Sequence, residues 1–121
     1  MAQRSILIAD DEQEAVEILT DFFQDAGYEV LTANNGQEAL EHLKNKKPTI
    51  AILDLRMPIV DGEAVIRQMP EISPNTKIIV ATGYTDEEYI ENKVLSQNVD
   101  AFLEKPIDLD TLQATIDKLC T

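Results

Sequence analysis

IAILDLRMPIVDG is the sequence of residues 50–62, and this stretch decides the fold class. It begins with an apolar run of the kind that forms a short strand buried on both faces of a parallel sheet. Asp54 follows the run directly, and Asp61-Gly62 marks the expected start of a helix a few residues later. A buried strand that ends in an acid and leads through a loop into a helix is typical of α/β proteins.

The same succession of strand and helix is repeated along the chain. Further short apolar runs, rich in β-branched residues, predict four more buried strands: Ile6–Ala9, Val30–Ala33, Ile78–Ala81 and Ala101–Leu103. Together with Ile50–Leu53, these runs alternate with stretches of helical periodicity. The pattern predicts one α/β domain over residues 1–121, with a flavodoxin-like, doubly wound, five-stranded parallel sheet in the order 2-1-3-4-5 and with five helices.

The helices are expected to begin at polar residues that follow the strands. The second to fifth helices begin near Asn35, Asp61, Thr85 and Asp108. Asn35 and Glu38 form a capping pattern, in which each side chain bonds to the backbone of the other residue's turn. Gly27 is expected to end the first helix because glycine adopts a left-handed conformation easily, and Pro70 is expected to end the third because proline donates no backbone hydrogen bond.

The first and fourth expected helices differ in their apolar faces. The first has a broad stripe, flanked by Val16 and Phe23, that consists of Ala15, Leu19, Phe22 and Ala26. The fourth has only a thin apolar face, made by Ile90, Val94 and Leu95. Such a thin face fits a helix that shifts or binds a partner, and it fits a merely exposed helix equally well.

The charge of the chain argues against several classes of function. It has 23 acidic and 10 basic residues, and its net charge of −13 opposes nonspecific attraction to nucleic acid and to anionic membranes. We therefore expect this domain to bind neither directly. No apolar run approaches the ~20 residues of a membrane-spanning helix, the start of the chain is a poor signal peptide, and Cys120 has no second cysteine for an internal disulfide. These features favour a cytoplasmic protein.

Polar residues stand at the carboxyl ends of most of the expected strands. In chain order they are Asp10, Asp11 and Glu12, then Asp54, then Thr82, then Lys105 with Pro106. In the 2-1-3-4-5 order the first and third strands are neighbours, which brings Asp10 and Asp11 beside Asp54. Because converging carboxylates repel one another, such a crevice favours a hard divalent cation. We expect Mg²⁺, with Mn²⁺ as a substitute, since carboxylates, water and phosphate oxygens are its preferred ligands.

Four short motifs lie in order at these strand ends: Ala9-Asp10-Asp11-Glu12, Asp54–Gly62, Ala81-Thr82-Gly83 and Asp100–Pro106. One such motif alone occurs often by chance, whereas four in order at predicted strand ends form a specific pattern. From Ile6 to about Leu119, the chain resembles the receiver domains of two-component response regulators. The resemblance implies a phosphorylation-dependent signalling switch.

The resemblance also implies roles for the acids. Asp54 would accept a phosphoryl group from a phosphohistidine on a histidine kinase or phosphotransfer protein. Mg²⁺ would be held by Asp10, Asp11 and Asp54, directly or through water, and the backbone carbonyl of Arg56 would be a further ligand. The side chains of Arg56 and Tyr84, at the edge of the site, would influence how long the phosphoryl group survives, or would only cover the loops.

The same resemblance assigns the residues that follow the last two strands. Lys105 and Thr82 would each contact a phosphoryl oxygen, and the bond between Lys105 and Pro106 would be cis. Phe102 would change rotamer as Thr82 moves inward, and the face formed by the fourth helix, fifth strand and fifth helix would change with it. Simple core packing remains the alternative for Phe102.

A receiver of this kind would be a signalling domain with only self-catalysed phosphorylation and dephosphorylation, and not an enzyme with sustained turnover. Its partners would be the kinase or phosphotransfer protein and an output domain or downstream protein, with dimerisation left open. A receiver that serves only as a non-switching interaction scaffold is an alternative, but the presence of Asp54, Thr82 and Lys105 argues against it.

Two other classes of protein share parts of the pattern. Phosphohydrolases of the haloacid-dehalogenase type also use an aspartate nucleophile with Mg²⁺, but they place a second aspartate two residues later, where this chain has Arg56. A flavodoxin-like FMN module needs a glycine- and hydroxyl-rich phosphate loop after the first strand. The acids Asp10, Asp11 and Glu12 would repel that phosphate.

Overall fold

The computed structural model describes residues 4–83 and 99–120. These residues form five strands: β1 (Ser5–Ala9), β2 (Glu29–Ala33), β3 (Ile50–Leu53), β4 (Lys77–Thr82) and β5 (Ala101–Glu104). They also form four helices: α1 (Gln13–Asp25), α2 (Gly36–Lys46), α3 (Gly62–Ile72) and α5 (Leu109–Leu119). The predicted fourth helix, with its start near Thr85, lies outside the described residues. Every predicted strand agrees with the structure to within one residue at each end.

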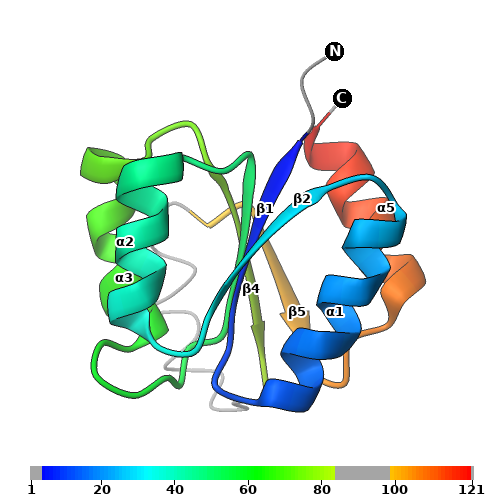
Figure 1. The fold of residues 1–121 in the computed structure, drawn as a ribbon, viewed down its shortest axis with the longest axis horizontal. Coiled ribbons are helices and arrows are strands. Elements are labelled where there is room, and N and C mark those ends of the chain that lie inside the picture. Colours follow the sequence, from blue (N-terminus) through cyan, green and yellow to red (C-terminus); the bar gives the residue numbers. More distant parts are fainter. Residues whose placement is uncertain (1–3, 84–98, 121) are drawn as a thin grey trace.

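The five strands form one parallel sheet in the order β2-β1-β3-β4-β5, as the sequence predicts. Helices α1 and α5 cover one face of the sheet, and α2 and α3 cover the other (Figure 1). β1 begins and α5 ends at the amino edge of the sheet, the edge at which the parallel strands start (Figure 1). All five strands therefore point their carboxyl ends at the opposite edge, where the predicted site lies.

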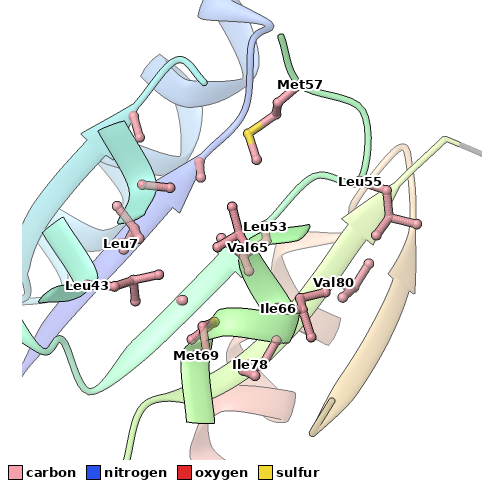
Figure 2. Close-up of a cluster of buried hydrophobic side chains, with 14 residues drawn as sticks. Leu7, Leu43, Leu53, Leu55, Met57, Val65, Ile66, Met69, Ile78 and Val80 are labelled. Carbon is pink, nitrogen blue, oxygen red and sulfur yellow. The ribbon is translucent and has the colours of Figure 1, made fainter. Parts of the chain in front are cut away.

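The core has two halves, one on each face of the sheet. Successive strand residues alternate between them, so that Leu7 packs toward α2 and α3 while Ile6 and Ile8 pack toward α1 and α5. Figure 2 shows the half on the α2 and α3 side, with Leu43 and Val65 among the labelled side chains. Because both faces are covered, the strands need apolar residues at consecutive positions, which explains the unbroken apolar runs in the sequence.

Capping side chains define the starts of the helices. Asn35 accepts a hydrogen bond from the backbone N–H of Glu38 at 2.9 Å, and the Glu38 carboxylate accepts one from Asn34 N–H at 2.8 Å. The bond to Asn35 confirms the predicted start of α2, while the Glu38 carboxylate bonds to the residue before the cap. Asp61 and Asp108 cap α3 and α5, each by accepting a hydrogen bond from the backbone N–H three residues later.

The sequence predictions are wrong in detail at two helices. The buried stripe of α1 runs through Val16, Leu19 and Phe23. The predicted stripe included Ala26, which lies at the exposed C-cap. The buried face of α1 is therefore rotated about the helix axis relative to the prediction. Helix α3 continues past Pro70 to Ile72. Proline lacks only the hydrogen bond to the preceding turn, and so close to the helix end that loss does not stop the last residues from remaining helical.

The contact between α3 and the loop after β3 leaves no room for a side chain at Gly62. A Cβ atom built there would lie 2.1 Å from the backbone oxygen of Asp54 and 2.8 Å from the Cα of Leu55. Gly62 N–H also donates to the Leu55 carbonyl at 2.9 Å. The start of α3 is therefore held directly against the backbone of Asp54 and Leu55, the two residues that follow β3.

We expect Gly62→Ala to lower the free energy of unfolding by about 1–3 kcal/mol, because the new methyl group forces backbone segments apart. Urea denaturation followed by circular dichroism measures this loss. Gly83→Ala is the matched control, since a Cβ atom at Gly83 meets nothing within 4 Å. Equal stability of the two variants would contradict the close packing described here.

Candidate functional site

The ends of β1 and β3 place two carboxylates side by side. Asp10 N–H donates to the Ala33 carbonyl and Asp54 N–H donates to the Ala9 carbonyl, each at 3.0 Å, so the hydrogen-bond pattern of the sheet continues one residue beyond both strands. The backbones of both acids are thereby fixed. Both residues are only 6% exposed, an unusual degree of burial for aspartate.

Lys105 brings a positive charge to these acids from β5. Its Nζ lies 2.6 Å from Asp10 Oδ2, 3.1 Å from Asp54 Oδ2 and 3.1 Å from Glu12 Oε1. Its backbone N–H donates to the Thr82 carbonyl at 2.9 Å, which ties the residue to the end of β4. The following peptide bond, to Pro106, is cis, as expected.

Glu12 joins the site, although its place among the strand-end acids was the only role predicted for it. It occupies the N-cap position of α1, yet its side chain makes no capping hydrogen bond and extends to Lys105. Carboxylate oxygens of Asp10, Glu12 and Asp54 lie within 4.8 Å of one another, close enough to hold a metal ion. Asp11 is exposed and lies outside this group of three, although it lines the same cavity.

Burial and close contact shift the pKa values of Asp10 and Lys105. Burial raises the pKa of Asp10, and the hydrogen bonds from Lys105 and from Glu12 N–H only partly oppose this effect. Burial alone would lower the pKa of Lys105, but its hydrogen bonds to Asp10 and Asp54 outweigh burial and raise it. Lys105 is therefore firmly protonated at neutral pH, and its charge partly neutralises a cluster that would otherwise be strongly anionic.

An open cavity of about 1000 Å³ exposes this cluster to solvent. Its floor is acidic, and one wall is apolar, with contributions from α1 and from the segment between β5 and α5. The lining residues are Asp10, Asp11, Glu12, Ala15, Ile18, Leu19, Asp54, Arg56, Thr82, Gly83, Lys105, Pro106, Ile107 and Leu109. The arrangement gathers carboxylate oxygens and an ammonium group around one space.

The structure also describes three further residues that were predicted to belong to the site. Thr82 is 1% exposed at the end of β4 and lines the cavity. Phe102 pairs with Val80 across β4 and β5 and packs partly buried on the α2 and α3 side of the sheet. Arg56 is exposed at the cavity rim, and its backbone N–H donates to Asp54 Oδ1 at 3.3 Å. Tyr84 lies outside the described residues.

The family model of the response regulator receiver domain matches residues 6–117. The chain belongs to this family. Among curated proteins, it is 32% identical over 113 residues to the transcriptional regulatory protein ZraR of Escherichia coli strain K12, a match that covers 93% of this chain and 25% of ZraR. It is 29% identical over 120 residues to sporulation initiation phosphotransferase F of Bacillus subtilis strain 168, which covers 98% of this chain and 94% of that protein.

Solved structures agree with this membership. The response regulator protein TrrA of Thermotoga maritima, whose structure is a complex with Mg²⁺-BeF, superposes with a TM-score of 0.84 at 32% identity. The match covers 97% of this receiver domain and 99% of TrrA. The receiver domain spans only about a quarter of the length of ZraR. No helix in the described part of the receiver domain has the length and apolar character needed to cross a membrane.

We expect Lys105→Met to destabilise the metal-free receiver domain by about 3 kcal/mol, because two buried carboxylates lose the cation that pairs with them. Urea unfolding in the presence of a chelator measures the loss. Combining the change with Asp54→Asn should restore part of the stability, since one of the repelling charges is then gone. Lys77→Met is the control, because Lys77 is exposed at the amino end of β4.

The pH dependence of this loss follows from the raised pKa of Lys105. The stabilisation by the ammonium is complete below the ordinary lysine pKa of 10.5, and it disappears as the pH rises through the higher folded-state value. The difference between wild type and Lys105→Met should therefore stay constant between about pH 7 and pH 9. A difference that vanishes within that interval would show that the ammonium is not held as described.

Proposed function

We propose that this receiver domain accepts a phosphoryl group on Asp54 in a Mg²⁺-dependent reaction and so acts as a signalling switch. The observation that carries the proposal is the convergence of Asp10, Glu12 and Asp54 on the ammonium of Lys105, inside a cavity open to solvent. Membership of the receiver family implies phosphorylation-dependent signalling. The resemblance to receiver domains implies a role for each matched residue, and the geometry of this chain supports these roles.

Asp54 is the nucleophile in the proposed reaction. The N–H of Arg56 and the Nζ of Lys105 each hold one of its carboxylate oxygens, which fixes the carboxylate plane against rotation. One oxygen attacks the phosphorus of a phosphohistidine, a P–O bond forms, the P–N bond breaks, and the histidine nitrogen keeps the electron pair. Fixed geometry of this kind is the main contribution of a protein to phosphoryl transfer.

The acids fit Mg²⁺ as a ligand set. Oxygens bound to Mg²⁺ at about 2.0–2.1 Å lie about 3–4 Å apart, so three oxygens within 4.8 Å of one another need only a small contraction. We propose that Asp10, Asp11 and Asp54 would hold the ion directly or through water, with the backbone carbonyl of Arg56 as a further oxygen ligand. A bound Mg²⁺ would neutralise negative charge on the phosphoryl oxygens. The complex of TrrA with Mg²⁺-BeF supports this choice of metal.

Lys105 is placed to exchange its hydrogen-bond partners when a cation and a phosphoryl group bind. The Lys105 ammonium lies within 3.1 Å of a carboxylate oxygen of each of the three acids. It is therefore free to transfer its hydrogen bonds from a carboxylate to a phosphoryl oxygen once a cation takes over the acids. Because Lys105 N–H is bonded to the Thr82 carbonyl, the side chain can move while its backbone stays in place.

Thr82 and Phe102 form the proposed switch. Strand residues alternate between faces, so Thr82 lies on the same face as Val80, and Val80 is the cross-strand partner of Phe102. A phosphoryl oxygen that draws the Thr82 hydroxyl into the cavity would vacate space next to Phe102 on that face. The change would alter the surface formed by the predicted fourth helix, β5 and α5, which would contact an output domain or downstream protein.

The partners in this proposal are a histidine kinase or phosphotransfer protein on one side and an output on the other. The similarity to sporulation initiation phosphotransferase F along nearly the whole of both chains supports a role in a phosphorelay. The similarity to ZraR, a transcriptional regulatory protein four times as long as the matched segment, supports control of an attached output domain. The charge of −13 fits a domain that does not itself bind nucleic acid.

Acetyl phosphate with Mg²⁺ should add one phosphoryl group, a mass gain of about 80 Da at a group with roughly two negative charges. The gain should be absent in Asp54→Asn, which keeps the shape of the side chain but not its nucleophilic oxygen. Intact-protein mass spectrometry measures both. Labelling that persists in Asp54→Asn, or that never appears in the wild type, would overturn the proposed function.

Lys105→Met should bind Mg²⁺ more tightly than wild type, because the cation no longer competes with an ammonium group. Two unit charges 4 Å apart interact by about 1 kcal/mol even at the dielectric constant of water, so the dissociation constant should fall at least about fivefold. Isothermal titration with MgCl₂ measures it, with Lys77→Met as control. Unchanged or weaker binding would mean that Lys105 does not occupy the cation site.

A further inference from the structure

Strand β2 lies at one edge of the sheet and has a neighbouring strand, β1, on one side only (Figure 1). Glu29 N–H and the Ala33 carbonyl form hydrogen bonds to the residues that flank β1, at 2.9 Å and 3.0 Å. Because the hydrogen-bonding groups of successive strand residues point to opposite sides, Val30 and Thr32 direct their N–H and C=O groups away from the sheet. Outward groups of this kind can pair with a further strand.

His42 of α2 covers one of these outward groups. Its Nε2 lies 3.0 Å from the carbonyl oxygen of Thr32. Because a carbonyl oxygen can only accept a hydrogen bond, Nε2 has to carry the proton and donate it. Within residues 4–83 and 99–120, no other residue bonds to the outward backbone groups of Val30 or Thr32. The imidazole is therefore the one described contact on this edge.

The bond from His42 is not what holds β2 in the sheet. All five residues of β2 pair with β1 in an unbroken register. The start of α2 is fixed separately, because the Asn35 side chain accepts a hydrogen bond from Glu38 N–H. What the bond does is remove an exposed acceptor from an edge strand, and proteins limit unwanted strand pairing with features of this kind.

The outward groups of β2 complement those of a second copy of the same strand. An antiparallel pairing about a two-fold axis at Leu31 sets Val30 of each copy opposite Thr32 of the other. Residues paired in this way exchange two hydrogen bonds, and the Thr32 carbonyl accepts one of them. Half of the acceptors in the pairing are thus the carbonyls that His42 covers. Glu29 of one copy does not face Glu29 of the other, so the register opposes no like charges.

We propose that β2 is a pairing edge for a second copy of this chain and that His42 keeps this edge closed. The net charge of −13 on each copy also opposes the association at low ionic strength. Salt weakens that repulsion, whereas only a change at His42 uncovers the Thr32 carbonyl. Pairing leaves the acidic site intact, because the Ala33 carbonyl bonds to Asp10 N–H on the opposite side of β2.

The hydrogen bond can be tested first in the unmodified protein. His42 is the only histidine of the chain, so every imidazole signal in a nuclear magnetic resonance spectrum belongs to it. Two-bond correlation between ring protons and nitrogens should show that the neutral ring carries its proton on Nε2. A neutral ring with its proton on Nδ1 would overturn the proposal, because Nε2 could then not donate to Thr32.

Two variants separate the hydrogen bond from the bulk of the ring. His42→Phe keeps a ring of similar size without a donor, and His42→Gln keeps an N–H donor. Sedimentation velocity in about 1 M NaCl, where the Debye length is about 3 Å, measures self-association with little charge repulsion. The dimer dissociation constant of His42→Phe should be about 5-fold to 150-fold below that of wild type, since pairing no longer breaks two bonds from His42. His42→Gln should resemble wild type.

A further change locates the contact. Thr32→Pro, added to His42→Phe, removes an outward N–H, while the bonds to β1 remain because they belong to the neighbouring residues. The double variant should associate no more strongly than wild type, and circular dichroism checks that it is folded. In the His42→Phe dimer, hydrogen exchange at the Val30 and Thr32 amides should be slower than in His42→Gln.

Three results would contradict the closed pairing edge. His42→Phe may not associate more strongly than wild type, His42→Gln may associate as strongly as His42→Phe, or the His42→Phe dimer may form without protection of the Val30 and Thr32 amides. The last result would place the dimer contact on another surface. None of these outcomes requires phosphorylation of Asp54, so the proposed function is tested separately.

Discussion

The arrangement of acids at the carboxyl edge of this domain depends on the ion pairs that Lys105 makes with them. Two buried aspartates and a glutamate converge there, and their mutual repulsion would oppose folding if no cation stood between them. The strands place the carboxylates close together, and the positive charge of Lys105 offsets their mutual repulsion. A residue that arrives from β5, more than ninety positions along the chain from Asp10, thus completes a cluster that begins at β1. The site and the fold therefore form together.

This arrangement gives the domain a site that is organised before any ligand arrives. The carboxylates are already gathered around the ammonium of Lys105. Replacing one cation by another requires small side-chain movements while the strands stay fixed, since the backbones of Asp10 and Asp54 continue the hydrogen bonds of the sheet. Preorganisation of this kind reduces the reorganisation that charge transfer demands from a protein.

Much of this could be predicted from the sequence because it depends on local signals. Apolar runs located the strands, and the alternation with helices led to the strand order and hence to Asp10 beside Asp54. The errors arise where tertiary contacts determine which face of a helix is buried or where the helix ends. Packing on the sheet rotates the buried stripe of α1, and α3 continues past Pro70. Glu12 was missed because no pattern shows which way an N-cap side chain points.

The ends of the fold have a consequence for communication. β1 begins and α5 ends at the amino edge of the sheet, one full strand length from Asp54 (Figure 1). Any module joined at either end is thus attached at the pole opposite the acids, about 15 Å away for a five-residue strand. A change at Asp54 is thus separated from the point of attachment by the length of the sheet. Coupling between Asp54 and a module attached there would therefore pass through the helices that cover the sheet, while the hydrogen-bonded strands stay in place.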